Sequence, residues 1–151
     1  MVKKASFIHA LNRAGALYLD TSLLIYQLED ILPYSALTEV VFNSIENKKH
    51  EGHISVLSIL ELNVKPYQLG QSKTALTQVS LLKNLPHMTI HPIDLETADK
   101  AAQFRARYRL KTPDAIHASC AWVHRCQTII GNDKEFSKVK ETSYLHLDHF
   151  L

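Results

Sequence analysis

In the segment Leu17-Tyr-Leu-Asp-Thr-Ser22, a carboxylate stands where a short apolar strand passes into a helix. A similar arrangement recurs in three later segments, Ile54-Ser-Val-Leu-Ser-Ile-Leu-Glu61, Thr112-Pro-Asp-Ala-Ile-His117 and Ile129-Ile-Gly-Asn-Asp133. Parallel strands point the same way, so their carboxyl ends and the helix starts that follow share one edge of a sheet. We therefore expect four acids to gather at this edge: Asp20, Glu61, Asp114 and Asp133.

Apolar strand-like runs alternate with stretches of helical period along the chain. Strands are predicted at residues 16–19, 53–57, 88–91, 128–130 and 143–147. Helices are predicted over residues 23–28, 33–49, 58–66, 72–85, 94–109 and 112–124, with a short helix from Lys134. This alternation predicts an α/β fold with three layers, α/β/α, and a central parallel sheet covered on both faces.

The composition indicates one compact domain. The chain has 151 residues, of which 46% are hydrophobic, enough to form a core. We place this domain at residues 16–151 and interpret residues 1–15 as an N-terminal extension. The net charge of +2 permits a polyanionic partner without requiring one.

The sequence contains no signal for secretion or membrane insertion. Cys120 and Cys126 provide no disulfide framework, and no apolar run approaches the ~20 residues needed to span a bilayer. His9, Asn12 and Arg13 interrupt the apolar stretch near the N-terminus, so we do not interpret it as a signal peptide. We predict a cytoplasmic protein without membrane contact.

Each of the four acids also has an ordinary explanation as a helix cap. Ser58 and Glu61 match a capping box, Asp114 lies in a first turn that Thr112 would cap, and Asp133 is a plausible N-cap. However, the acids stand beside apolar runs, and a buried charge needs a partner. Four gathered carboxylates repel one another unless a cation is shared, and hard divalent ions prefer oxygen ligands. The pattern therefore predicts a metal-dependent hydrolase.

Three further side chains fall on one face of the helix predicted at 112–124: His117, Cys120 and His124. They allow a zinc hypothesis, but no CxxC pair or HExxH motif accompanies them. We interpret them as packing residues, since buried thiols and imidazoles are common in cores.

Four segments resemble the PIN-domain family, most closely the VapC-type ribonuclease toxins of prokaryotic toxin–antitoxin pairs. They are Leu19-Asp-Thr-Ser-Leu-Leu-Ile25, Ile54-Ser-Val-Leu-Ser-Ile-Leu-Glu-Leu62, Lys111-Thr-Pro-Asp-Ala-Ile-His117 and Ile130-Gly-Asn-Asp-Lys-Glu-Phe136. The resemblance extends from about residue 16 to the C-terminus and implies a PIN-like α/β/α fold. It also implies an endoribonuclease that hydrolyses RNA phosphodiester bonds with Mg²⁺ or Mn²⁺.

By this resemblance, Asp20, Glu61, Asp114 and Asp133 match the family's catalytic, metal-binding acids. Thr21 and Ser22 match hydroxyl positions that order the first loop. Gly131 departs from the pattern, because the family often has Thr or Ser two residues before the last acid. Asn132 is the candidate to replace part of that hydrogen bonding.

The resemblance further implies an RNA substrate, a cognate antitoxin and a homodimer. Four basic residues precede the third acid: Arg105, Arg107, Arg109 and Lys111. They either form a solvated helix face or contact RNA. Two other functions stay open: a non-catalytic PIN module that binds RNA or a protein, which the Gly131 departure keeps alive, and a nuclease of housekeeping RNA processing.

Overall fold

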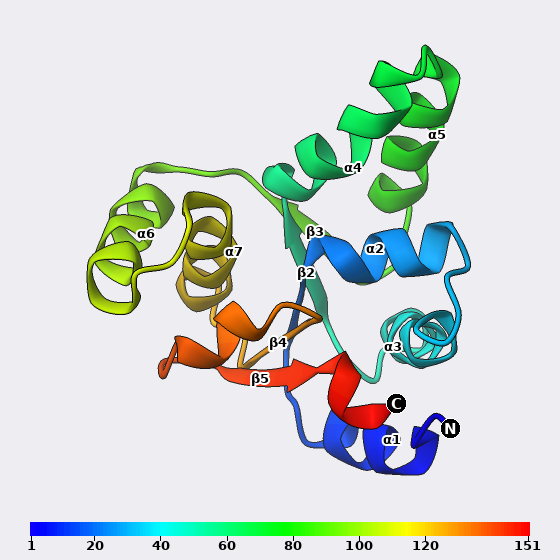
Figure 1. Cartoon of the computed structure of the whole chain (residues 1–151), viewed down its shortest axis with the longest axis horizontal. Helices are drawn as coiled ribbons and strands as arrows, with labels where there is room; N and C mark the ends of the chain where they lie inside the picture. The colour runs from blue at the N-terminus through cyan, green and yellow to red at the C-terminus, as the bar shows by residue number, and fades with distance from the viewer.

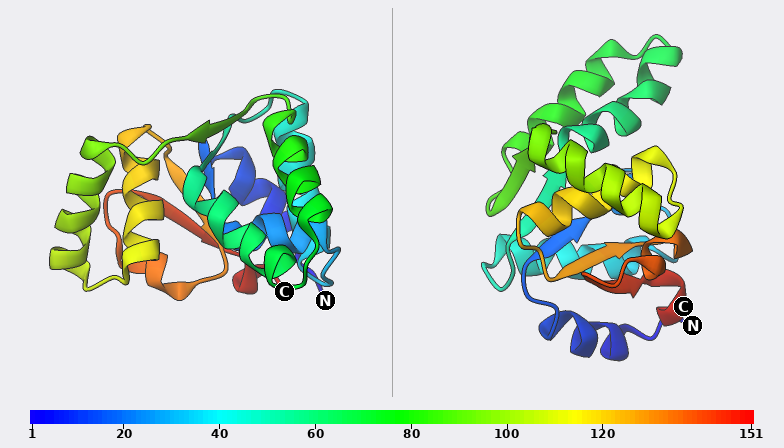
Figure 2. Two further views of the ribbon diagram at one scale, coloured as in Figure 1. Left: turned by 90° about the horizontal axis from the view of Figure 1, so that it is seen from above. Right: turned by 90° about the vertical axis from the view of Figure 1, so that its left-hand side faces the viewer.

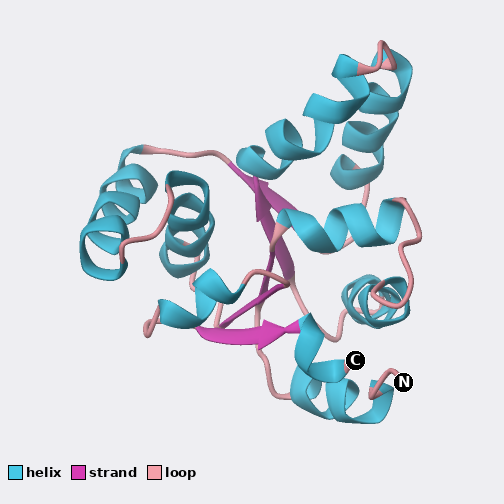
Figure 3. Ribbon diagram, in the orientation of Figure 1, coloured by secondary structure: helices cyan, strands magenta, loops and turns pink.

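The computed structural model describes all residues from 1 to 151. Its centre is a five-stranded sheet in the order β3-β2-β1-β4-β5, and every pair of neighbours is parallel (Figures 1 and 3). The strands are β1 (Leu17–Leu19), β2 (Gly52–Ser55), β3 (Met88–His91), β4 (Thr128–Gly131) and β5 (Ser143–His146). The parallel sheet predicted from the sequence is confirmed, with all five strands within two residues of their expected positions.

Helices cover both faces of the sheet, which confirms the three-layer α/β/α architecture (Figure 1). The helices on one side are α1 (Lys4–Asn12), α2 (Thr21–Leu28) and α3 (Ser35–Glu46), and the hairpin that projects beyond them consists of α4 (Val56–Gln68) and α5 (Ser72–Lys83). The helices on the other side are α6 (Leu95–Tyr108) and α7 (Thr112–Val123). The chain also forms two 3₁₀ helices, η1 (Lys134–Lys138) and η2 (Leu147–Phe150). Figure 2 shows that α4 and α5 form a hairpin that extends away from the sheet.

The central strand β1 is buried on both faces. Successive side chains of a strand point to opposite faces, so Leu17 and Leu19 pack into the core beneath α1, α2 and α3, whereas Tyr18 packs into the core beneath α6 and α7. All three side chains are fully buried. This is why the strand is a continuous apolar run rather than an alternating one, and it fixes Asp20 at the strand's carboxyl end.

Three local predictions were wrong. Helix α4 begins at Val56 because Ser55 is its N-cap and accepts a hydrogen bond from the backbone N–H of Leu57 (3.2 Å), so Ser58 is not a cap. Pro66, which we expected to end or kink this helix, does not end it, because α4 continues to Gln68. The N-cap of α7 is Lys111, and no side chain caps this helix, although Thr112 is its first residue.

None of the helices has the length and the apolar character that a membrane-spanning helix needs.

Helix α1, in the segment that we interpreted as an extension, packs on the domain. Phe7 and Leu11 belong to the same buried cluster as β1, and the ring of Phe7 meets that of Phe150 edge to face at 5.1 Å. The backbone N–H of Lys3 donates to the Phe150 carbonyl (2.7 Å), so the two termini lie side by side (Figure 2).

We expect Phe7→Ala to lower the free energy of unfolding by roughly 3–5 kcal/mol, because it leaves a cavity in the core. The matched control is Ile8→Ala on the same helix, whose side chain is 39% exposed and whose loss should change stability by about 0.5 kcal/mol or less. Urea unfolding measures both. Equal effects would mean that α1 contributes nothing specific to the core.

Candidate active site

The four predicted acids occupy one edge of the sheet, each placed by local structure. Asp20 is the N-cap residue of α2 directly after β1, and Asp133 is the N-cap residue of η1 after β4. Glu61 lies in the second turn of α4, which follows β2, and Asp114 lies in the first turn of α7. The parallel topology therefore collects them as the sequence predicted.

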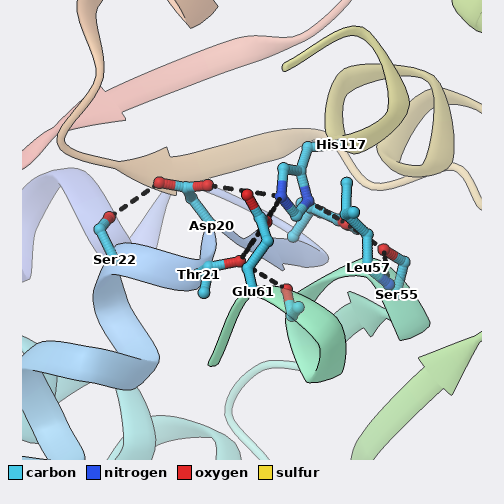
Figure 4. Close-up of polar contacts among 9 residues, drawn as sticks. Asp20, Thr21, Ser22, Ser55, Leu57, Glu61 and His117 are labelled. Atoms are coloured by element: carbon cyan, nitrogen blue, oxygen red, sulfur yellow. Dashed lines mark hydrogen bonds and ion pairs between the residues drawn. The ribbon is translucent and has the colours of Figure 1, made fainter. Parts of the chain in front are cut away.

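Asp20 is held in a largely buried position. Its Oδ2 accepts a hydrogen bond from Ser22 Oγ (2.8 Å), and its Oδ1 lies 3.8 Å from His117 Nε2 (Figure 4). Burial raises the pKa of Asp20 and the charge of Glu61 raises it further, whereas His117, Ser22 and the Thr21 backbone act in the opposite direction. The net result is a raised pKa, so ionised Asp20 lacks a full countercharge.

Glu61 is the acid with a built-in partner. Its Oε1 lies 2.6 Å from His117 Nε2 and accepts a hydrogen bond from Thr21 Oγ1 (2.8 Å). Burial opposes ionisation of Glu61, but the hydrogen bond and charge of His117, with the bond from Thr21, outweigh it and lower the pKa. The capping-box interpretation of Ser58 and Glu61 is wrong, because Ser58 Oγ instead meets Thr21 Oγ1 at 3.0 Å.

His117 is the site residue that sequence reasoning missed. Its ring is buried, with Nδ1 2.8 Å from the Tyr18 hydroxyl and Nε2 on Glu61. A carboxylate only accepts hydrogen bonds, so Nε2 donates to Glu61, and the ring is fixed at both nitrogens. The signal was available: His117 follows Asp114 by three residues, which places both side chains on the same face of α7.

The pKa of Asp114 is raised. Burial, followed by repulsion from Asp133 and Asp20, raises its pKa from the ordinary value of 3.8 to about 6. Asp133 accepts a hydrogen bond from the Glu135 N–H (3.0 Å), so it caps η1 and repels Asp114 at the same time. The cap and the functional interpretation of Asp133 are therefore compatible.

Asn132 does not turn toward the acids. Its Nδ2 donates to the Tyr26 hydroxyl (3.2 Å) and its Oδ1 accepts from the Asp148 N–H (3.1 Å). Both ends of the amide are thus occupied by residues outside the acidic group. The expectation that Asn132 replaces the missing hydroxyl at position 131 is not supported by this geometry.

Gly131 is required by space. A Cβ added there would lie 2.9 Å from Asp20 Cβ and 3.3 Å from Asp20 Oδ2. The two strands are fixed at this point because the Asp20 N–H donates to the Ile130 carbonyl (2.9 Å). A side chain at residue 131 must therefore displace Asp20 or the strand.

The four basic residues have different surroundings. Arg105 Nε donates to the Leu110 carbonyl (3.0 Å) and so stabilises the turn between α6 and α7. Arg107 lies 3.6 Å from the carboxylate of Glu141, and Arg109 is the left-handed C-cap of α6. Lys111 is exposed and close enough to Glu135 to influence its charge. Of the four, Lys111 stands nearest in sequence to the acids.

The acids have the chemistry of a hard-cation site, although they do not form a complete ligand cage. No group of three or more His, Cys, Asp or Glu side chains is arranged to hold a metal ion, which also leaves the zinc hypothesis without support. However, Asp20, Asp114 and Asp133 offer only oxygen donors, and burial, followed by the charge of neighbouring carboxylates, raises the pKa values of Asp20 and Asp114. These donors suit Mg²⁺ or Mn²⁺, and binding would require them to converge.

Comparison with known proteins places the chain in a family. The model of the PIN domain matches residues 17–142, while none of the curated proteins matches significantly. Similar folds occur in VapBC2 from Rickettsia felis bound to a DNA fragment from its promoter (TM-score 0.67, 14% identity, 87% of this chain and 98% of that chain). A toxin–antitoxin complex from Klebsiella pneumoniae (0.63, 22%, 88% and 98%) and DNA-bound VapBC from Salmonella typhimurium (0.68, 17%, 88% and 98%) are also similar. At these identities the likeness shows the fold.

We expect Gly131→Ala to destabilise the protein by about 1–3 kcal/mol through overpacking against Asp20. Gly52→Ala is the matched control, since its Cβ would meet the side-chain ends of Ile45 and Met88, which can rotate away. Urea unfolding, with the carboxyl ¹³C shift of Asp20 as a local reporter, checks both variants. An unchanged Asp20 signal in Gly131→Ala would contradict the crowding argument.

Asp114 should make stability fall as pH rises from 4 to 6. The folded state holds the Asp114 proton up to about pH 6, whereas the unfolded chain releases it near pH 4, so folding binds a proton between these values. We expect Asp114→Asn to flatten this dependence and to be more stable than the wild type at pH 7 without metal. Melting temperatures in EDTA, with Asp99→Asn on exposed α6 as control, test this. Parallel curves for the two variants would refute it.

Proposed function

Because this chain belongs to the PIN domain family, we propose that it is a metal-dependent endoribonuclease that hydrolyses RNA phosphodiester bonds. The observation that carries the proposal is the unbalanced negative charge of Asp20 and Asp114, which repel each other and lie close to Asp133 at the sheet edge. A protein without a cation to bind gains nothing from keeping three such carboxylates together. Perturbed pKa values of this kind are typical of functional sites.

Mg²⁺ or Mn²⁺ is the proposed cofactor, held by Asp20, Asp114 and Asp133. When bound, such an ion supplies Lewis-acid activation of water and of the scissile phosphate. The protein contributes the positions of its ligands. Ser22 holds one oxygen of Asp20, and the narrow space at Gly131 keeps this side chain from retreating toward β4.

Glu61 is proposed as the fourth acid of the site, and hydrogen bonds to one of its carboxylate oxygens orient its side chain. Thr21 and His117 both bind Oε1, and the Tyr18 hydroxyl holds the far side of the His117 ring. The second carboxylate oxygen, Oε2, makes none of these contacts and is available to a ligand. His117 and Thr21 are thus positioning residues for Glu61.

We further propose that the protein is the toxin of a toxin–antitoxin pair and assembles as a homodimer. One of the solved structures with a similar fold is a toxin–antitoxin complex from Klebsiella pneumoniae. A largely apolar groove of about 690 Å³ runs along α4 next to α5 and includes Leu60, Val64 and Tyr67. These side chains are exposed, and exposed apolar patches of this kind mark protein-interaction sites. An antitoxin segment or a second copy of the chain would cover them.

One observation favours the alternative of a non-catalytic PIN module. The acids are not arranged to hold a metal ion without rearrangement, as expected for a site that no longer needs one. In that case the protein would bind RNA or a partner protein through the same fold. Cleavage measurements separate the two functions.

We expect the purified protein to cleave RNA with Mg²⁺ or Mn²⁺, and Asp20→Asn and Asp114→Asn each to reduce the rate by on the order of a hundredfold or more. EDTA should stop the reaction and excess Mn²⁺ restore it. Asp99→Asn, which removes the same charge from the exposed surface of α6, should cleave like the wild type.

Retained cleavage by well-folded Asp20→Asn and Asp114→Asn would contradict the assignment of the site. RNA binding without cleavage by the wild type, across several structured RNAs and both metals, would support the binding module instead. Circular dichroism and melting temperatures establish that each variant is folded.

A further inference from the structure

A polar cavity lies beside the acids, between η1 and β5. It measures about 500 Å³, within the range of small-ligand sites. Asp133 directly precedes η1, so the cavity begins one residue from the candidate active site. None of its lining residues is acidic, and the polar ones include Lys134, Lys140, Thr142, Tyr144, His146 and His149.

Three lining side chains have buried polar atoms without a hydrogen-bond partner in the protein. They are Thr142 Oγ1, Tyr144 OH and His146 Nε2, which make up three of the eight such atoms in the whole chain. Tyr144 and His146 alternate along the edge strand β5, so their side chains share one face, and Thr142 directly precedes this strand. Buried polar groups are normally paired because leaving them unpaired destabilises the fold. Their concentration here indicates a site for a polar ligand.

The charge of the cavity favours an anion. Lys134 and Lys140 are exposed and line the cavity. The intervening Lys138 is paired with Glu135 at 2.6 Å, and Lys134 is close enough to Glu135 to contribute to the lowered pKa of that carboxyl. Carboxylates also lie close by, because Asp133 directly precedes Lys134 and the Oδ2 of Asp148 lies 3.8 Å from His146 Nε2. Its other oxygen accepts a hydrogen bond from the Tyr34 hydroxyl (2.8 Å). Two exposed ammonium groups and several hydroxyls are the donors that phosphate oxygens require.

Flat rings line the same cavity. The Tyr144 and His146 rings are stacked with centroids 5.6 Å apart, and the exposed His149 ring follows at 4.7 Å. Rows of aromatic rings beside basic residues are how proteins bind single-stranded nucleic acids, by stacking on bases and neutralising phosphates. Tyr144 also links the cavity to the acids, because a Cβ on Gly131 would lie 3.4 Å from the Tyr144 hydroxyl and 2.9 Å from Asp20 Cβ.

We propose that this cavity binds one nucleotide of a single-stranded RNA, with its phosphate at Lys134 and Lys140 and its base against His149. The inference rests on the proposed ribonuclease function, since the nucleotide in the cavity would be a neighbour of the phosphodiester bond that is cleaved at the acids. This arrangement explains how RNA remains bound next to a group of carboxylates. The attraction of its phosphate to the two lysines, one nucleotide away, offsets the repulsion between RNA and the acids.

The test is fluorescence anisotropy of the full-length protein with a labelled six-nucleotide single-stranded RNA, in EDTA so that metal-dependent cleavage is suppressed. We expect Lys134→Ala/Lys140→Ala to weaken binding about tenfold and to reduce the slope of log K against log salt by ~1.4, or about 0.7 for each lysine. Lys73→Ala/Lys83→Ala removes the same charge from α5 and should change binding less than about twofold. Equal effects of the two double variants, or no binding by the wild type, would overturn the proposal.

Thr142→Val distinguishes a ligand-binding hydroxyl from a structural one. Because Thr142 Oγ1 has no partner in the protein, its replacement by a methyl should leave the melting temperature unchanged or raised, while RNA binding falls. A loss of stability without a loss of binding would overturn the assignment of Thr142 to the ligand.

The cleavage assay described above is run in parallel, so the two proposals fail separately. Cleavage that is unaffected by Lys134→Ala/Lys140→Ala, together with unchanged binding, removes the subsite and leaves the nuclease. Binding that depends on these lysines without any cleavage retains the subsite and removes the ribonuclease function.

Discussion

Carboxylates that share one edge of a parallel sheet repel one another, and the four at this edge meet that repulsion in different ways. The ionised form of Glu61 is stabilised by its contacts with His117 and Thr21, which outweigh the effect of burial and lower its pKa. Asp20 and Asp114 have raised pKa values because burial and neighbouring charge act on them without full compensation. The edge therefore contains one acid whose ionised form is stabilised by hydrogen bonds and two acids whose ionised forms are destabilised, and under the proposed function a bound cation would stabilise the latter two.

The same local devices build the fold and the site. Asp20 and Asp133 both stand at N-cap positions, where negative charge is favourable because the first helical N–H groups lack partners. Helix starts after parallel strands thus place acids at one edge at little cost in local geometry. Further packing then constrains them: Gly131 leaves no room behind Asp20, and the Tyr18 hydroxyl holds the His117 ring against Glu61.

Positive charge and aromatic rings adjoin the acids at the opposite side of Asp133. The cavity between η1 and β5 has exposed lysines, stacked rings and unpartnered hydroxyls, whereas four carboxylates meet at the edge itself. Tyr144 belongs to both regions, because burial and the charges of Asp20 and Asp133 together raise the pKa of its hydroxyl. Under the proposed function, an RNA strand that crosses this boundary would pass from a region that attracts its phosphates to one that repels them unless a cation is bound.

The sequence by itself determined the order of strands and helices, the parallel sheet and the edge at which the acids meet, because these follow from hydrophobic period and from chain direction, which are local properties. It also indicated the PIN family. Only the tertiary structure decided that His117 pairs with Glu61, which is 56 residues away, and that Ser58 contacts Thr21 instead of capping a helix. It also decided that Asn132 bonds to Tyr26 and Asp148. At Gly131 it left no space for a side chain, because Asp20 lies against that residue. These contacts join elements far apart in the chain, so they depend on how the layers pack, and no local pattern of residues specifies that packing.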